Sequence, residues 1–392
     1  MAKRVVLHVG AMKTGTTSLQ RTLYANRTRL ADAGILVPGA RWGIQVDAVL
    51  DVLGKEAHPT GRPVRGAWDR LVAETRAWPG TAVISVELLA PAGPAQIERI
   101  AASFADARLD VVLSLRDLNR TVPAMWQETV QNGRSWTWDD YVAGVERGRP
   151  RPRRRDDEIS PASHSFWRQQ AGVRLVRHWR TAGTVHLVTV PRPGSPTSLL
   201  LERFGAVVGF DASALEAPEP VNTSLGAAST EVLRRMNSEL DARGLTFPAG
   251  IRIRKRLFAK QVLPALARDE RRIGVPVMPW TEEHAAGMVA GLQELAPPLY
   301  GEWADLRPSP VPGITASDVT IEEVAAAAAT GYRALHAALS IPDRHTGILD
   351  ADGIPEWEPG AASPEQVARE GAVALADLVT WAVRATAPRV GA

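Results

Sequence analysis

Residues 4–20 read RVVLHVGAMKTGTTSLQ: an aliphatic run, a glycine turn, and a run of hydroxyl-bearing and helix-forming residues. The aliphatic run predicts a buried strand over 4–10, and the residues after Gly15 predict the start of a helix. In a strand–turn–helix unit, the amides of the first helical turn converge at the turn and form a site for an anion. The stretch therefore predicts a phosphate-binding loop as the first βα connection of an α/β fold.

Further strands alternate with helices along the first half of the chain. Runs rich in Val, Ile and Leu predict strands at 81–90, 109–117 and 185–191, and helical patterns lie between them at 95–105 and around 167–179. Strands of this composition are typical of a parallel sheet that is buried on both faces. We therefore expect a three-layer α/β fold with a P-loop-like first connection and helices on both sides of the sheet.

The second half of the chain is predicted to be mainly helical. Helical periodicity dominates from about residue 215 onward, and the Pro-rich stretch at 305–316 has the composition of a linker. We therefore expect one domain over 1–305, whose part at 215–305 is mainly helical. A helical C-terminal extension is expected over 306–392.

Two helix starts are marked within that extension. Thr320 is followed three residues later by Glu323, and Ser363 is followed three residues later by Gln366. Each pair has the spacing of a capping box, in which the two side chains bond the first free amides of a helix. The extension is thus predicted to contain at least two helices.

Composition narrows the class of protein. The chain has 392 residues, a net charge of +3 and no cysteine. The charge is too small to indicate a nucleic-acid partner, and the lack of cysteine excludes disulfides, thiolate metal sites and cysteine nucleophiles. No apolar run approaches the roughly 18 residues of a membrane span, and the N-terminal one is shorter than a signal-peptide core. We therefore expect a cytoplasmic protein without a membrane span.

The order of residues in the loop decides which phosphate group it suits. Gly15 lets a bound oxyanion approach the backbone, Lys13 adds a positive charge, and Thr16, Thr17 and Ser18 add uncharged hydroxyls. A nucleoside-triphosphate loop reads G-x-x-x-x-G-K-[ST], with the lysine after the second glycine. Here the lysine precedes that glycine, which disfavours a metal-chelated triphosphate.

The stretch GAMKTGTTSLQ at 10–20 resembles the 5′-phosphosulfate loop of sulfotransferases that use 3′-phosphoadenosine 5′-phosphosulfate (PAPS), in the form typical of bacterial members. The resemblance implies that Lys13 stabilises the charge that develops on the bridging oxygen as the sulfuryl group leaves. It also implies a small-molecule or carbohydrate acceptor with a hydroxyl or amine, and no metal. The residues implied to bind the donor in this loop are Lys13, Thr14, Gly15, Thr16, Thr17 and Ser18.

The third predicted strand leads into VVLSLRDLNRTVPAMWQE at 111–128. Arg116 stands where the family has the arginine that binds the 3′-phosphate, and Arg120 follows one turn later. A strand-end ion pair with Asp117 or Asp140 is the alternative role for Arg116. The family has a serine eight residues after its arginine, whereas Ala124 stands here and cannot donate a hydrogen bond. Thr121 and Arg120 are the candidates to replace that contact.

Two residues are candidates for the base that takes the acceptor's proton. Glu87 follows the second strand, where open α/β sheets place ligand-facing side chains, and Ser85 and Glu87 match an S-x-E pattern of related bacterial sequences. A structural carboxylate that bonds loop amides or Lys13 is the equally weighted alternative. His58 is the second candidate because imidazole titrates near neutrality. Its Pro/Gly-flanked loop equally favours a surface position.

Other polar residues near these strands receive less direct predictions. His8 lies within the first strand and is predicted to be a buried, hydrogen-bonded residue that shapes the loop. Gln45 and Asp47 fall where the acceptor pocket begins in similar proteins, and Trp42 is a candidate to line it. The arginine-rich stretch at 146–158 is either a solvated loop or a cationic lid over an anionic ligand.

Three functions therefore compete. A PAPS-dependent sulfotransferase is the leading hypothesis. A P-loop kinase or other small-molecule phosphotransferase is the second, and the order of Lys13 and Gly15 disfavours it. The third is a non-catalytic nucleotide-binding relative, which Ala124 favours.

Overall fold

The computed structural model describes residues 2–150, 159–216, 218, 225–245, 247–342, 347–348, 350–360 and 362–386. The chain forms two compact units, each built from three stretches that alternate along the sequence. Unit 1 comprises Met1–Val122, Gly144–Pro220 and Val277–Ser309; unit 2 comprises Pro123–Ala143, Val221–Pro276 and Pro310–Ala392. The residues at 215–305 contribute to both units, and the expected boundary near 305 lies close to the last crossing. The division at 305 itself stays a prediction.

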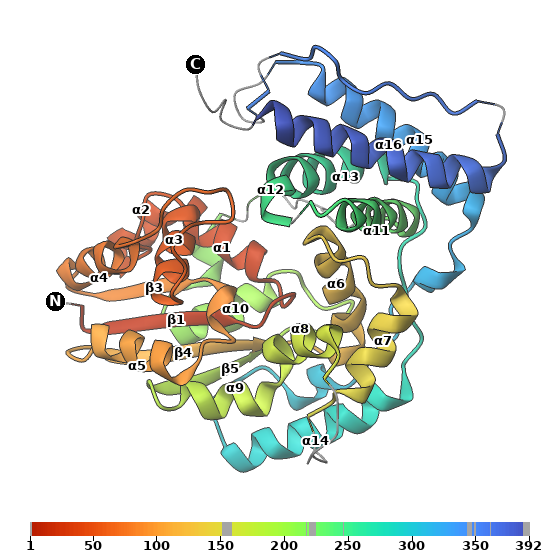
Figure 1. The fold of residues 1–392 in the computed structure, drawn as a ribbon. Helices are drawn as coiled ribbons and strands as arrows, with labels where there is room; N and C mark the ends of the chain where they lie inside the picture. Colours follow the sequence, from red (N-terminus) through yellow and green to blue (C-terminus); the bar gives the residue numbers. More distant parts are fainter. Residues whose placement is uncertain are drawn as a thin grey trace. The chain divides into compact units, whose positions relative to one another are not determined.

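Unit 1 contains a parallel sheet of six strands in the order β2-β3-β1-β4-β5-β6 (Figure 1). Each neighbouring pair is parallel. This arrangement confirms the α/β fold that the aliphatic strands predict. The strands are β1 (Arg4–Gly10), β2 (Ile35–Leu36), β3 (Thr81–Ser85), β4 (Arg108–Leu115), β5 (Thr184–Thr189) and β6 (Leu299–Tyr300).

The predicted strands differ from the observed ones mainly at their ends. The first prediction matches β1, whereas the strand predicted over 81–90 ends at Ser85 and is followed by a 3₁₀ turn, η1 (Glu87–Leu89). The apolar residues of that turn are buried without being part of the sheet, so composition alone extends the strand too far. The edge strands β2 and β6 have two residues each and carry no recognisable pattern.

Helices cover both faces of the sheet and form two hydrophobic cores. Alternate residues of β1 separate the two faces, since Leu7 packs in one core and Val6 in the other. The first core is covered by α3 (Trp42–Val52), α4 (Ala67–Ala77), α5 (Pro94–Ser103), α9 (Gly172–Trp179) and α14 (Pro279–Leu295). The second is covered by α1 (Thr16–Ala25), α2 (Arg27–Asp32) and α10 (Leu199–Val208). These are the three layers that the sequence predicts.

The other elements of unit 1 are short or lie at its borders. They are α8 (Pro161–Gln170), η2 (Ala212–Ala214) and η4 (Trp303–Leu306). Two helices run from one unit into the other: α6 (Leu118–Gln131) and α7 (Trp138–Arg147).

Unit 2 is helical. Its long helices α11 (Ala227–Ala242), α15 (Ile321–Leu339) and α16 (Pro364–Ala385) pack against one another (Figure 1). Its shorter elements are α12 (Phe247–Ile251), a π-helix η3 (Arg252–Val262), α13 (Leu263–Leu266) and η5 (Ala316–Asp318). The helical C-terminal extension is therefore confirmed as α15 and α16. No helix in the described ranges combines the length and the apolar composition that crossing a bilayer requires.

The two predicted helix starts are both observed. Thr320 Oγ1 accepts from the amide of Glu323 at 3.3 Å, and the Glu323 carboxylate accepts from the amide of Thr320 at 2.9 Å, which completes the capping box of α15. Ser363 caps α16 through the amide of Gln366 at 3.4 Å. The side-chain amide of Gln366 donates to Glu370 at 2.8 Å.

Candidate functional site

The loop between β1 and α1 has a left-handed backbone at three positions. The φ angles are +123° at Gly10, +64° at Lys13 and +84° at Gly15. Glycine adopts such angles without strain, whereas a lysine does so only where its surroundings impose it. Gly10 also has little room for a side chain, because a Cβ there would lie 3.2 Å from the carbonyl oxygen of Glu87. The loop is thus a constrained turn packed against η1.

Carbonyl groups of the loop are held by the surrounding protein. The Ala11 oxygen accepts from Thr14 Oγ1 at 2.6 Å, the Met12 oxygen from Gln170 Nε2 at 2.9 Å, and the Lys13 oxygen from Arg116 Nη1 at 3.3 Å. In a planar trans peptide the following N–H points opposite to the C=O. The N–H groups of residues 12–14 are therefore turned away from these donors, as in the anion-binding concavities formed by successive amides.

The hydroxyl residues of the loop fall into two groups. Thr14 and Thr16 are buried, and the hydroxyl of Thr14 is used to hold the turn. Thr17 and Ser18 are exposed in the first turn of α1, which begins at Thr16 with Gly15 as its N-cap and no side-chain cap. The Thr14 hydroxyl therefore shapes the loop, and binding of the donor by residues 13–18 stays a prediction.

His8 lies directly below the loop and joins three strands. Its Nδ1 lies 2.8 Å from Ser85 Oγ on β3, and its Nε2 lies 3.1 Å from Ser114 Oγ on β4. The ring is fully buried, and burial lowers its pKa to about 4. The structure confirms the buried, hydrogen-bonded histidine that the strand position predicts. A neutral imidazole here fixes the carboxyl ends of β3 and β4 on either side of the loop.

Glu87 lies beside the start of the loop and is held by α1. Gln20 Nε2 donates to Glu87 Oε2 at 2.7 Å and to the carbonyl oxygen of Ser85 at 3.1 Å. Gln20 is buried, whereas Glu87 is half-buried. The same Ser85 oxygen accepts from Trp42 Nε1 at 3.1 Å, and the Trp42 ring is 38% exposed. Three side chains therefore gather at the carboxyl end of β3, and two of them, Glu87 and Trp42, are partly exposed.

Gln20 was not expected from the sequence as a member of the site. It lies one helical turn after Thr16, on the side of α1 that faces β3. The signal that could have found it is its place at the end of the K-T-G-T-T-S-L-Q run. Its bond to Glu87 depends on a contact between residues far apart in the sequence.

Gln45 and Asp47 lie on α3, and each is bonded to residues outside this helix. Gln45 is fully buried, and it accepts from the amide of Ser85 at 2.8 Å and donates to the Pro38 oxygen at 3.0 Å. Asp47 forms an ion pair with Arg62, with Nη2 2.7 Å from Oδ1. Gln45 thus supports the end of β3 from behind.

His58 lies in the turn that the Asp47–Arg62 ion pair ties to α3. Its Nδ1 lies 2.7 Å from Thr60 Oγ1 and accepts from the amide of Thr60 at 3.1 Å. One ring nitrogen is therefore engaged within its own turn. Of the two candidate bases, it is Glu87 that the structure brings against the loop.

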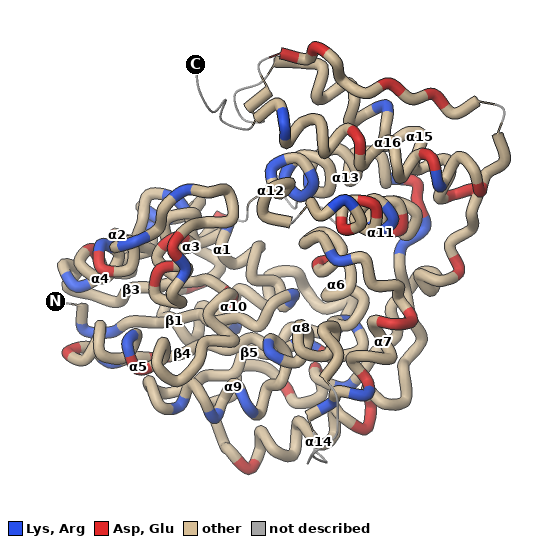
Figure 2. Tube along the Cα trace, viewed as in Figure 1, with Lys and Arg blue, Asp and Glu red and all other residues tan. Residues whose placement is uncertain are grey.

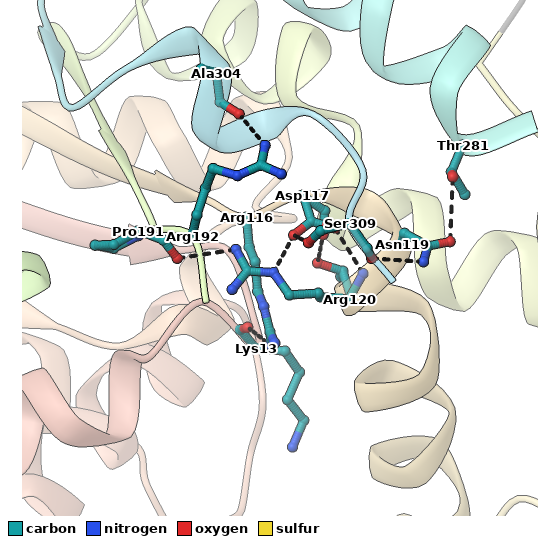
Figure 3. A network of polar contacts seen from close by, with 11 residues as sticks. Lys13, Arg116, Asp117, Asn119, Arg120, Pro191, Arg192, Thr281, Ala304 and Ser309 are labelled. Atoms are coloured by element: carbon teal, nitrogen blue, oxygen red, sulfur yellow. Dashed lines mark hydrogen bonds and ion pairs between the residues drawn. The ribbon is translucent and has the colours of Figure 1, made fainter. Parts of the chain in front are cut away.

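Arg116 is the cation that follows β4 (Figure 3). Its Nη1 donates to the Lys13 oxygen, while its buried Nε has no hydrogen-bond partner among the described residues. Burial and the neighbouring Arg120 lower its pKa to about 10, so the guanidinium remains charged at neutral pH. A buried charged donor without an acceptor costs free energy, and an oxyanion would remove that cost.

Arg120 is bonded to other groups of the protein. Its Nε pairs with the Asp117 carboxylate, its backbone amide donates to Asp117 Oδ1 at 2.9 Å, and its Nη2 donates to the Pro191 oxygen at 3.1 Å. Asp117 is fully buried and also accepts from Ser309 Oγ at 3.2 Å. The carboxylate that follows Arg116 therefore pairs with Arg120. Arg120 organises this turn, while Arg116 faces the loop.

Asn119 extends this network in unit 1 (Figure 3). Its Nδ2 donates to the Ser309 oxygen at 2.9 Å, and its Oδ1 accepts from the amide of Met278 at 3.1 Å. Thr121 donates its hydroxyl hydrogen to the Asp117 oxygen at 2.8 Å and is fully buried. That hydrogen is therefore unavailable to replace the donor missing at Ala124, which belongs to unit 2.

Two expectations concern groups that the described residues only partly cover. Residues 151–158 of the arginine-rich stretch lie outside the described ranges, so its role stays a prediction. Among the residues that the structure describes, no cluster of three or more His, Asp or Glu side chains could hold a metal ion.

Comparisons with known proteins give one structural likeness. No family model matches the chain, and no curated protein is similar to it. Among solved structures, the chain is similar to the crystal structure of a sulfotransferase from Alicyclobacillus acidocaldarius, with 16% identity and a TM-score of 0.36. The match covers 67% of this chain and 98% of the other. A likeness with so low an identity and TM-score carries no functional argument. Any argument about function therefore depends on the residues of the site.

Proposed function

We propose that this chain is a sulfotransferase that moves a sulfuryl group from PAPS to a hydroxyl or amine of a small-molecule or carbohydrate acceptor. The observation that carries the proposal is the loop at 10–18. Its carbonyls are bound from outside, its amides are turned the opposite way, and Lys13 and Arg116 stand beside them. Such a concavity suits a phosphate or sulfate group without a metal ion.

The residues fit a nucleotide that carries a phosphosulfate. The buried Nε of Arg116 has no acceptor among the described residues, and a phosphate oxygen would provide one. The Lys13 ammonium and the amides of residues 12–17 are donors for the phosphosulfate. PAPS supplies a sulfur centre whose bond to the phosphate oxygen breaks as a new bond to the acceptor oxygen or nitrogen forms.

Each nearby side chain then has a defined task. Lys13 and the loop amides stabilise the negative charge that develops on the phosphate oxygen as its bond to sulfur breaks. Glu87 takes the proton that the acceptor loses. Gln20 holds the Glu87 carboxylate through one oxygen, which leaves the other oxygen to receive that proton.

Two features of the chain disfavour a metal-dependent kinase. The lysine precedes the second glycine of the loop, and the carboxylate that follows β4 is already bound by Arg120 and Ser309. In a kinase of this architecture, a carboxylate at such a strand end coordinates Mg²⁺.

Thermal unfolding with nucleotides tests the proposal. The product nucleotide 3′-phosphoadenosine 5′-phosphate (PAP) is expected to raise the melting temperature, whereas ATP with Mg²⁺ is expected to have little effect, because a ligand stabilises only the state that binds it. Lys13→Ala should weaken the PAP effect and abolish sulfate transfer from labelled PAPS to a panel of phenols, sugars and amines.

Lys55→Ala is the matched control, since Lys55 is an exposed lysine of the same unit in the segment between α3 and α4. Stabilisation by ATP with Mg²⁺ and not by PAP would overturn the proposal. Binding of PAP without transfer to any acceptor would favour a non-catalytic relative.

A further inference from the structure

Helices α9 and α14 of unit 1, together with Arg149 and Pro150, line a half-open cavity of about 700 Å³. It lies on the side of α9 that faces away from the sheet, because Leu175 and Val176 of this helix are buried in the sheet core while Arg174 and Arg177 are exposed. Its lining includes none of the loop residues 10–18, nor Glu87 or Arg116. The cavity is therefore separate from the proposed donor site.

The lining of the cavity contains both apolar and basic side chains. Val173 and Met288 provide apolar surface, and Arg149, Arg174 and Arg177 provide three guanidinium groups. The arginines of α9 are visible as blue segments in Figure 2. A surface of this kind matches a molecule with an apolar body and a negatively charged end.

Arginines outnumber carboxylates among the described residues that line the cavity. Glu283 is the one carboxylate among them, and it accepts from Arg149 Nη1 at 2.8 Å. Arg174 Nη2 donates to the Trp167 oxygen at 2.7 Å. Two histidines in the lining remain neutral. Burial followed by Arg149 lowers the pKa of His284 to about 4, and burial followed by Arg174 lowers that of His178.

Gly287 keeps the cavity open at the middle of α14. A Cβ at this position would meet no atom within 4 Å, so packing does not require a glycine there. Glycine inside a helix destabilises it relative to alanine. At position 287 the missing side chain leaves the space of the cavity open.

We propose that the cavity between α9 and α14 binds an organic anion, with its carboxylate, phosphate or sulfate group against the arginines and its apolar part against Val173 and Met288. The arginine side chains offer forked donors for such a group. The lining residue Ala171 directly follows Gln170, which holds the Met12 carbonyl of the loop. The site therefore adjoins a support of the loop without sharing its ligands.

Fluorescence titration of the full chain with 8-anilinonaphthalene-1-sulfonate tests this site. The wild-type protein should bind this probe in the cavity with an increase in fluorescence. Gly287→Leu fills the space and should weaken binding at least tenfold, and circular dichroism checks that the helix is kept. Ala290→Leu adds a similar bulk on an exposed position of the same helix outside the lining, and should leave binding unchanged.

Charge and head group are tested separately. Arg177→Glu should weaken probe binding at least tenfold, whereas Arg99→Glu, which changes an exposed arginine of α5, should not. 4-Nitrophenyl sulfate or 4-nitrobenzoate should displace the probe, and the stronger of the two identifies the preferred head group. Uncharged nitrobenzene should displace it much less.

Three results would overturn the proposal. They are no binding by the wild-type protein, equal binding by Gly287→Leu, or equal displacement by nitrobenzene and the two anions. None of these depends on PAP binding, so the cavity and the proposed function can fail independently. A supporting readout is the pKa of His284 measured by NMR, which should rise when an anion offsets Arg149.

Discussion

Acid should destabilise this protein through His8, whose ring is locked in the neutral state between Ser85 and Ser114. The folded protein lowers the pKa of His8 from 6.5 to about 4 through burial. Between these two values the unfolded chain binds a proton that the folded chain does not, so the free energy of unfolding falls as the pH falls. The contribution is fully present above pH 6.5 and is lost progressively toward pH 4.

The size of the effect follows from the same two pKa values. Each pKa unit corresponds to about 1.4 kcal/mol, so the shift from 6.5 to about 4 is worth about 3 kcal/mol. His284 shifts in the same direction, so the wild-type pH profile alone does not isolate His8. The difference between the wild type and a variant that cannot titrate at position 8 removes the other groups.

Urea unfolding followed by tryptophan fluorescence, at several pH values between 4.5 and 7.5, measures this difference. His8→Gln and His8→Asn should be less stable than the wild type at pH 7.5, because each loses part of the bonding to Ser85 and Ser114. Their deficit should shrink by roughly 2–3 kcal/mol toward pH 4.5. A difference that stays constant across this range would refute the assignment of His8 as a neutral buried residue.

Three further predictions concern the loop, the base and a helix end. Glu87→Gln retains an oxygen that accepts from Gln20, so this variant should fold normally. It should lower the rate of sulfate transfer by roughly 10²–10⁴-fold, while His58→Ala should keep a rate near that of the wild type. The reverse pattern in steady-state rates would identify His58 as the base. Gly15→Ala forces alanine to a φ of +84° and places its Cβ 2.5 Å from a methyl group of Leu200. It should lower the free energy of unfolding by about 1–2 kcal/mol and weaken PAP binding, as calorimetry would show. Thr320→Ala removes the side-chain cap of α15 and should cost about 1 kcal/mol in urea unfolding, whereas Thr320→Ser should restore most of that loss.

The local parts of this protein are readable from the sequence. The strand at 4–10, the turn at Gly15 and the cap at Thr320 each depend on residues within about one helical turn of one another, so short patterns predict them. The parallel α/β fold follows from the same patterns repeated along the chain. The position of His8 within an aliphatic strand was enough to predict its burial.

Tertiary structure decided which of the polar residues near the loop act together. Arg116 and Arg120 are four residues apart and chemically alike, yet the fold pairs Arg120 with Asp117 and turns Arg116 toward Lys13. Glu87 and His58 were both candidate bases from the sequence, and only the fold shows that Gln20 on α1 holds Glu87 at the end of β3. The bonds of Arg116 to Lys13 and of Gln20 to Glu87 join residues that are 103 and 67 positions apart. The energies of these contacts depend on burial that no local pattern encodes.

The cavity between α9 and α14 and the interleaving of the two units have the same origin. Helices with ordinary amphipathic patterns give no sign of which glycine or which arginines line a cavity. The sequence by itself determined a parallel α/β fold with a glycine turn between its first strand and its first helix. Only the tertiary structure decided which charged groups can bind a ligand. The reason is that a charged group already paired within the protein is not available to one.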